Sequence, residues 1–131
     1  MSKKSINIDV KKFYANETMK WCKKTFGTNE RKRTKLIFEF SHRPRTMKKH
    51  IVFGNYCFWR NKITLYLPNC DTIHDIVSTI IHEYTHYLQS RTKYLDYQDH
   101  YYYSANPYER EAKRNEEKYT KTCITYIKSY L

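Results

Sequence analysis

The chain is poor in the residues that make linkers and tight turns. Its 131 residues include only two glycines and three prolines. No internal repeat, low-complexity segment or linker interrupts the sequence. A chain of this length builds one hydrophobic core. We therefore expect a single domain over residues 1–131.

Paired cysteines and long apolar runs are absent as well. The four cysteines (Cys22, Cys57, Cys70 and Cys123) are widely spaced, and no Cys-x-x-Cys pair indicates a structural zinc site or a redox centre. We expect buried or idle thiols. No stretch approaches the roughly 20 apolar residues of a membrane span, and no signal-peptide core follows residues 1–5. These features predict a cytoplasmic protein without membrane association.

Acidic residues are scarce, with 13 Asp and Glu against 25 Lys and Arg. From Lys23 to Lys49, ten basic residues face only Glu30 and Glu39. Such a charge favours anionic partners, namely nucleic acid, an acidic protein or a charged membrane surface, although it can also serve only to keep a small domain in solution. No zinc-finger, helix-turn-helix or RNA-recognition signature accompanies it. The frequent Lys, Asn, Tyr and Ile are typical of an AT-rich coding genome, such as that of a virus or phage.

The first half of the chain predicts a helix followed by three strands. Asp9 is placed to cap the helix and Gly27 to end it. Runs of β-branched and aromatic residues at 35–40, 50–59 and 62–67 predict the strands. The short Arg60-Asn61 connection favours a hairpin of the last two. We expect a three-stranded, mainly antiparallel sheet.

The second half predicts two helices. Asp71 or Thr72 can cap the first, which should run to about Arg91 and be followed by a loop rich in Tyr and Asp. Asn106-Pro107 marks the start of the second helix, which continues almost to Leu131. The expected fold is α+β, with the sheet backed by helices.

The motif His82-Glu83-Tyr84-Thr85-His86 carries the most specific chemistry in the chain. Positions i and i+4 share a helix face, so both imidazoles can reach one tetrahedral zinc ion, with Glu83 pointing at a water on the metal. The apolar residues of this helix form a stripe roughly opposite to the histidines (Ile73, Ile76, Val77, Ile80, Ile81, Tyr84, Tyr87 and Leu88). This position disfavours a core role for His82 and His86. A chance spacing on a solvated face is the remaining alternative.

A catalytic zinc ion usually takes a third protein ligand. The metzincin continuation is excluded, because it needs Gly and His where this chain has Gln89 and Thr92. Three candidates remain, namely His100, Glu109 and Glu111.

The last helix favours Glu109 among them. Glu109 lies about 50° from the centre of the apolar face of this helix, whereas Glu111 lies about 110° away. Asn106 and Glu109 also fit the spacing of a capping box, in which the carboxylate would bind the Asn106 backbone instead of a metal.

The two motifs resemble those of the small gluzincin metallopeptidases, including minigluzincin-like and ImmA/IrrE-like proteins. These share a His-Glu-x-x-His helix and a Glu-x-x-Ala segment that opens a later helix, which Glu109-Arg110-Glu111-Ala112 matches. The resemblance covers roughly residues 36–125. It implies a zincin-like fold and one catalytic Zn²⁺ held by His82, His86 and Glu109, with Glu83 as general base.

One position departs from the family pattern. Many relatives carry Asn or Asp directly after the Ala, where this chain has Lys113. Asn115 or Glu116 would then have to support a ligating histidine. A weaker resemblance is to SprT-like proteases, which act on proteins attached to DNA and use a third histidine, here His100. The Gly that usually follows and a Cys-rich zinc ribbon are missing.

The expected function is hydrolysis of peptide bonds in an intracellular protein or peptide by zinc-activated water. Candidate oxyanion or substrate contacts lie between the ligand helices (His100, Tyr101, Tyr102 and Tyr103). The strand before the motif (Ile63, Thr64, Leu65 and Tyr66) is expected at a sheet edge, where an extended substrate could pair with it. The alternative is a basic DNA-associated protein, either an SprT-like protease or a non-catalytic module with a structural zinc that uses the region Lys23 to Lys49.

Overall fold

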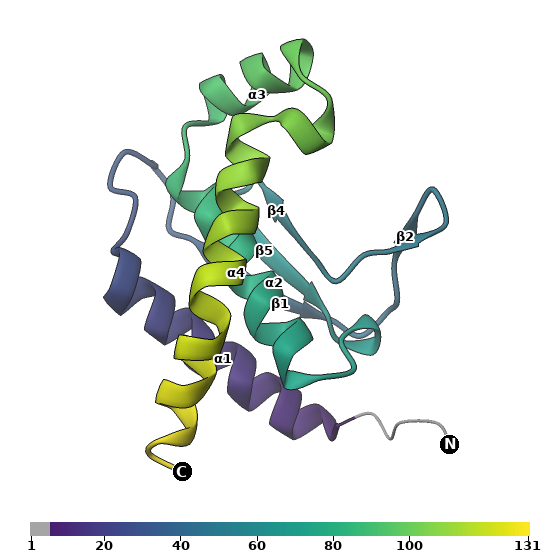
Figure 1. Ribbon diagram of the computed structural model, residues 1–131, viewed down its shortest axis with the longest axis vertical. Helices are drawn as coiled ribbons and strands as arrows, with labels where there is room; N and C mark the ends of the chain where they lie inside the picture. The colour runs from purple at the N-terminus through teal and green to yellow at the C-terminus, as the bar shows by residue number, and fades with distance from the viewer. Residues whose placement is uncertain (1–5) are drawn as a thin grey trace.

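The computed structural model describes residues 6–131, which fold into an α+β structure. Figure 1 shows the helices and strands, coloured by their order along the chain. The four α-helices of this part are α1 (Ile8–Phe26), α2 (Ile73–Leu88), α3 (Arg91–His100) and α4 (Pro107–Lys128). The strands are β1 (Ile37–Ser41), β2 (Thr46–Met47), β3 (His50–Ile51), β4 (Gly54–Cys57) and β5 (Lys62–Tyr66). Two 3₁₀ turns, η1 (Leu67–Asn69) and η2 (Tyr103–Ala105), precede α2 and α4.

The main sheet has the strand order β1-β5-β4 and is mixed, not mainly antiparallel. The predicted hairpin is confirmed, because β4 pairs antiparallel with β5. β1 pairs parallel with β5. The chain leaves the sheet after β1, forms the separate β2–β3 hairpin and returns as β4. β5 therefore runs in the same direction as β1.

The predicted edge strand is the central strand of the sheet. Ile63, Thr64, Leu65 and Tyr66 belong to β5, which pairs with β1 on one side and β4 on the other. Its backbone groups are used on both sides, so it cannot accept a further strand. The prediction was wrong because β1 pairs parallel with the side of β5 that the β4–β5 hairpin leaves free.

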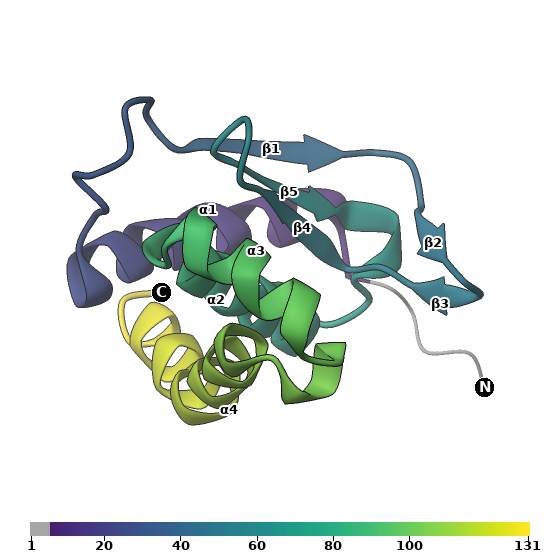
Figure 2. The same ribbon diagram turned by 90° about the horizontal axis from the view of Figure 1, so that it is seen from above.

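The helices lie on one side of the sheet. Figure 2 shows the three strands above α1 and α2, with α4 on the far side of α2. Ile63 and Leu65 point inward from β5 and are fully buried. The alternate residues face the open side, where the Lys62 ammonium pairs with Glu39 at 2.9 Å. This alternation is typical of a sheet covered on one face.

The first helix begins and ends close to the predicted positions. α1 is capped by Asn7, whose side chain accepts a hydrogen bond from the Asp9 backbone, and Gly27 ends it with a φ of 80°. Cys22, Cys70 and Cys123 are buried free thiols, as expected, while Cys57 is half-buried.

The segment after α2 is a helix and not the predicted loop. α2 ends at Leu88, and Ser90 caps α3. α3 has no buried residue. Because α3 places no residue in the core, its sequence does not show the regular spacing of apolar residues that predicts a helix.

No helix among residues 6–131 is both long and apolar enough to cross a membrane. The segment at 1–5, on which the argument against a signal peptide partly rests, lies outside the described residues.

Candidate metal centre

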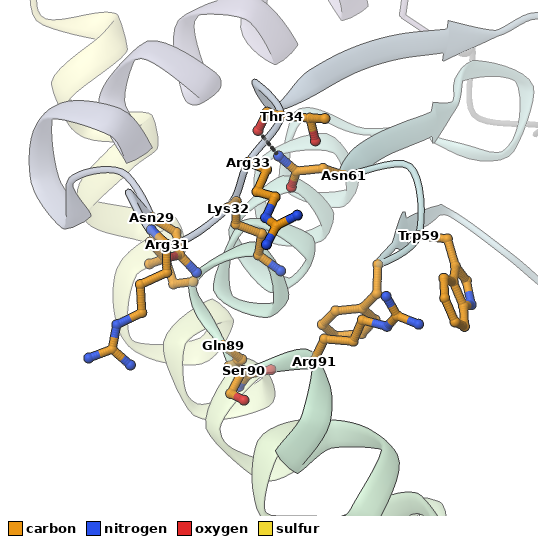
Figure 3. Close-up of a pocket in the computed structure, with 12 residues that line it drawn as sticks. Asn29, Arg31, Lys32, Arg33, Thr34, Trp59, Asn61, Gln89, Ser90 and Arg91 are labelled. Atoms are coloured by element: carbon orange, nitrogen blue, oxygen red, sulfur yellow. Dashed lines mark hydrogen bonds between the residues drawn. The ribbon is translucent and has the colours of Figure 1, made fainter.

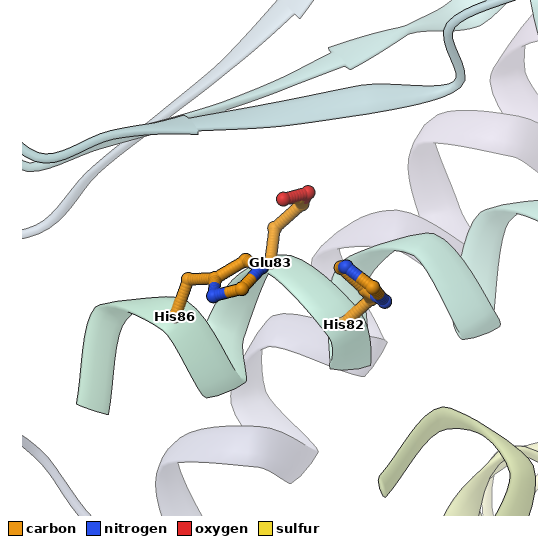
Figure 4. Close-up of side chains that lie close together, drawn as sticks. All are labelled: His82, Glu83 and His86. Carbon is orange, nitrogen blue, oxygen red and sulfur yellow. The ribbon is translucent and has the colours of Figure 1, made fainter. Parts of the chain in front are cut away.

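Helix α2 presents the motif toward α4. Its first turn is closed by a capping box, in which Thr72 accepts from the Asp75 backbone and the Asp75 carboxylate accepts from the Thr72 backbone. The predicted apolar stripe is largely buried, with Ile76, Val77, Ile80, Ile81 and Tyr84 at the core. Because this stripe fixes the rotation of the helix, His82 and His86 lie outside it. Figure 4 shows both imidazoles on α2, with Glu83 extending toward the strands.

His82, Glu83 and His86 form a group that could hold a metal ion. One ligand atom of each lies within 4.8 Å of the others. The two imidazole ring centroids are 5.0 Å apart. The i, i+4 spacing in the sequence therefore brings the side chains of His82 and His86 close together, with Glu83 beside them.

Glu109 meets both histidines from α4. Its Oε1 lies 2.8 Å from His86 Nε2, and its Oε2 lies 3.5 Å from His82 Nε2. Asn106 caps α4 by accepting from the Tyr108 and Glu109 backbones. The reciprocal half of the capping box does not form, because the Glu109 carboxylate is turned to the histidines. Glu109 therefore lies on the side of α4 that faces the histidines, which is consistent with the preference for Glu109 over Glu111.

One Glu109 oxygen has no hydrogen-bond partner. Oε1 accepts from the Tyr94 hydroxyl at 2.8 Å, in addition to its contact with His86. Oε2 is buried and unsatisfied within residues 6–131. A buried carboxylate oxygen without a partner is costly, and a cation bound beside it would remove this cost.

The outer nitrogens of both histidines are held by other side chains. His82 Nδ1 lies 2.8 Å from Glu116 Oε1, and His86 Nδ1 lies 2.7 Å from Gln89 Oε1. An oxygen acceptor at Nδ1 places the proton there and leaves Nε2 free to coordinate. Glu116 thus occupies the supporting position that the sequence left open between Asn115 and Glu116. Asn115 instead donates to Thr85.

Glu111 supports the site indirectly. It accepts a hydrogen bond from Gln89 Nε2 at 2.8 Å, and Gln89 also donates to the Tyr108 carbonyl. Glu111 therefore orients Gln89, which holds His86. The carboxylate that contacts the histidines directly is that of Glu109.

The charges of the cluster stabilise one another. Burial lowers the pKa of His82, but the nearby carboxylates of Glu109 and Glu116 outweigh it and raise the value to about 10. Burial opposes protonation of His86 too, and the neighbouring Glu109 carboxylate still raises the pKa. Burial raises the pKa of Glu109, whereas the two histidines lower it well below its usual range. For all three groups, the neighbours of opposite charge favour the charged form.

Glu83 is buried between α2 and β4. A Cβ at Gly54 would lie 2.5 Å from Thr79 Cγ2, and 3.7 Å from Glu83 Cγ. Only glycine allows β4 to pass this close to the helix. Burial raises the pKa of Glu83, while the charges of His82 and His86 oppose the rise. A carboxyl group with a raised pKa is suited to accept and return a proton.

The cluster opens into two adjoining cavities of about 220 and 470 Å³, both lined by His82, Tyr103 and Glu116. Glu83 and Gly54 line the smaller, and Glu109 the larger. The site is therefore accessible to a ligand.

The four candidate contacts between the ligand helices are placed differently. Tyr103 lines both cavities, although 70% of the residue is exposed. His100 is 69% exposed and bonds to the Asp96 carbonyl within α3. Tyr101 and Tyr102 are exposed, and neither lines a cavity at the cluster. Only Tyr103 of the four is near the histidines.

Sequence reasoning missed Gln89, Tyr94 and Gly54. Gln89 follows His86 by three residues, so its position on the next helical turn was a usable signal. Tyr94 lies in the segment predicted as a loop, and nothing in the sequence pointed to its contact with Glu109. Gly54 is one of two glycines in the chain, but only the approach of β4 to α2 explains it.

No protein-family model, curated protein or solved structure matches this chain. The function must therefore be inferred from the side chains themselves. They are two histidines with fixed outer nitrogens, a buried carboxylate against both, and a second carboxylate beside a cavity.

Proposed function

We propose that the protein is a zinc-dependent metallopeptidase of the gluzincin type. His82, His86 and Glu109 hold the metal, and Glu83 is the general base. The observation that carries the proposal is the meeting of both Nε2 atoms at one buried carboxylate, of which one oxygen lacks a partner.

The donor atoms fit a zinc ion. Tetrahedral ligands at 2.0–2.1 Å from zinc are about 3.3 Å apart, and histidine nitrogen and carboxylate oxygen are among its usual ligands. The distances from Glu109 to His82 and His86 are 3.5 and 2.8 Å, so ligation needs a shift of about half an ångström at one contact. Three protein ligands beside an open cavity are typical of catalytic zinc, because structural sites are closed by a fourth.

Zinc, when bound, supplies Lewis acidity for a scissile carbonyl and lowers the pKa of water. The chain itself moves the proton. Glu83 takes it from the attacking water and gives it to the leaving amine, so that the peptide bond yields a carboxylate and an amine. The carboxylate of Glu116 and the amide of Gln89 keep the two imidazoles in the coordinating tautomer.

The substrate strand belongs on β4 in this proposal. β4 is an edge of the main sheet, and Phe53 and Gly54 at its start line the smaller cavity with His82 and Glu83. An extended peptide added there would pass over the cluster by backbone pairing. Tyr103, on the other side of the cavity, is the hydroxyl placed to donate to the developing oxyanion.

The test is hydrolysis by the zinc-loaded protein and by Glu83→Gln. Mass spectrometry of an unstructured protein such as casein would identify cleaved peptide bonds. We expect Glu83→Gln to lower the rate by about 10²- to 10⁴-fold, with its zinc content unchanged. The matched control is Glu117→Gln, since Glu117 is exposed on α4.

Full activity in Glu83→Gln would show that Glu83 is not the base. A wild type that binds zinc tightly but cleaves nothing would favour the alternative of a non-catalytic module.

A further inference from the structure

A groove rich in cations lies outside the metal centre. It is formed by the loop after α1, the turn between β4 and β5, and the junction of α2 and α3 (Figure 3). It comprises two cavities of about 540 and 470 Å³ that share Asn29, Lys32, Arg33 and Thr34. We call it the basic groove and define it by its six cationic residues and one indole (Lys23, Arg31, Lys32, Arg33, Lys35, Arg91 and Trp59).

The cations of the basic groove have no carboxylate to neutralise them. No Asp or Glu lines either cavity. The ion pairs found within residues 6–131 include none of the six cationic side chains. Glu30 is exposed on the same loop but does not line the groove. Clefts lined by one sign of charge concentrate ligands of the opposite sign.

Lys32 shows that this charge is held in place. Its ammonium lies over two aromatic rings, 5.3 Å from the Tyr56 centroid and 5.1 Å from the Phe58 centroid. Figure 3 shows Lys32 and Arg33 extending from the loop toward the segment Gln89 to Arg91. Burial and the neighbouring charge of Arg91 lower the pKa of Lys32. An anion in the groove would relieve this repulsion.

Trp59 provides an aromatic surface at the rim. The residue is 76% exposed, the most exposed tryptophan or phenylalanine in the described part of the chain. The Arg91 guanidinium lies 3.1 Å from its ring centroid. An indole supported by an arginine and otherwise open to solvent offers a surface on which a planar group can stack.

We propose that the basic groove binds single-stranded nucleic acid, with the phosphates along the cations and an unpaired base stacked on Trp59. The combination of a positive groove and an exposed aromatic ring is the general design of sequence-tolerant single-strand binding. The bases of a duplex are already stacked and cannot use Trp59. An acidic peptide would meet the cations but would leave the indole unused.

Binding is measured as fluorescence anisotropy of labelled 20-nucleotide single strands of DNA and of RNA, with a duplex for comparison. Each phosphate contact to a single strand contributes about −0.7 to the slope of log K against log salt, so six cations give a slope of up to about −4. Trp59 fluorescence should be quenched on binding, while Trp21 is buried in the core and unaffected.

Two variants remove the two components of the groove separately. Arg31→Gln with Arg33→Gln should weaken binding at least tenfold and reduce the salt slope by about 1.4. Trp59→Ala should weaken it about five- to a hundredfold with little change of slope, and Trp59→Phe should restore part of the loss. The matched control is Arg114→Gln with Lys121→Gln, which removes the same charge from α4, away from both cavities. Thermal unfolding verifies that each variant is folded.

Three results would overturn the proposal. One is the absence of binding by the wild type at physiological salt. Another is an equal loss in the groove and control variants, which would mean attraction by net charge alone. The third is a preference for the duplex, or for poly-glutamate, without quenching of Trp59. Zinc content and peptide hydrolysis are independent of these outcomes, so either proposal can fail without the other.

Discussion

The metal cluster and the basic groove balance charge in opposite ways. At the cluster, two histidines are enclosed by Glu83, Glu109 and Glu116. At the groove, six cations lie together without a carboxylate. The chain has only 13 acidic residues, and several of the carboxylates on α2 and α4 are concentrated at one place. This difference supports our proposals of a bound cation at the cluster and of a bound anion at the groove.

Gln89 and the strand β4 connect the two regions. Gln89 holds His86 on one side and lines the groove on the other. β4 begins at Gly54, above the cluster, and the turn after it carries Trp59 to the groove. Because the two regions share these elements, substitutions that alter only one region are needed to test them separately.

Metal removal should have the largest effect. A ligand at a thousandfold excess over its Kd stabilises the fold by about 4 kcal/mol. We expect EDTA to lower the Tm by roughly 10 °C or more and to abolish hydrolysis. Differential scanning calorimetry measures the first effect and the casein assay the second. Oligonucleotide affinity should stay constant, and a parallel loss of it would mean that the groove depends on the metal.

The pH dependence of stability should differ between the metal-free and the zinc-loaded protein. In the metal-free protein the raised pKa of His82 stabilises the fold fully below pH 6.5, and this stabilisation is lost as pH rises through about 10. The raised pKa of His86 acts in the same direction. The lowered pKa of Glu109 stabilises it above pH 4.5, and this is lost in acid. The metal-free Tm should therefore fall from pH 6.5 to 9.

Zinc competes with protons for the same nitrogens, so the zinc-induced rise in Tm should grow over that pH range. Melting curves in EDTA and in zinc, at half-unit pH steps, check both trends. A zinc effect independent of pH would indicate that these imidazoles are not the ligands.

Glu116→Gln should weaken zinc binding by about 10- to 100-fold, because the partner of His82 Nδ1 loses its charge. Competition with a chromophoric chelator measures the Kd. Glu117→Gln, on the exposed side of the same turn, is expected to leave it unchanged. If the two variants behave alike, the hydrogen bond between Glu116 and His82 does not orient the ligand.

Gly54→Ala should destabilise the protein by about 1–3 kcal/mol through overpacking, since its Cβ would lie 2.5 Å from the Thr79 methyl group. Urea denaturation gives the free energy of unfolding. Thr79→Ala removes that methyl group, so the double variant should recover most of the loss beyond the effect of Thr79→Ala alone. Strictly additive effects would show that β4 does not press on α2 at this point.

Local signals in the sequence were sufficient for much of this structure. The spacing of His82 and His86, the caps at Thr72 and Asn106, and the hairpin at Arg60-Asn61 all depend on residues close in sequence. Glu109 was favoured over Glu111 by helix periodicity, because the apolar stripe of the last helix indicates which side faces inward.

Relations between distant segments were harder to predict. The parallel pairing of β1 with β5 depends on where the intervening chain leaves the sheet, which no local pattern encodes. Tyr94 was missed because α3 has no fully buried residue and no apolar period, although Tyr94 itself is half-buried beside Glu109. On α4, helix periodicity places Tyr126 and Tyr130 on the apolar face, but both are about half exposed, while Thr120 and Ile127 are buried. The face of α4 that α1 and α2 cover is therefore narrower than the apolar face predicted from its tyrosines.

Zinc content of the purified protein tests the central claim most directly. Wild type, Glu109→Ala, Glu111→Ala and His100→Ala would be dialysed against metal-free buffer and analysed by inductively coupled plasma mass spectrometry. We predict about one zinc per wild-type chain, its near-complete loss in Glu109→Ala, and its retention in His100→Ala and largely in Glu111→Ala. Equal zinc in all four proteins, or none in the wild type, would contradict a metal held by His82, His86 and Glu109.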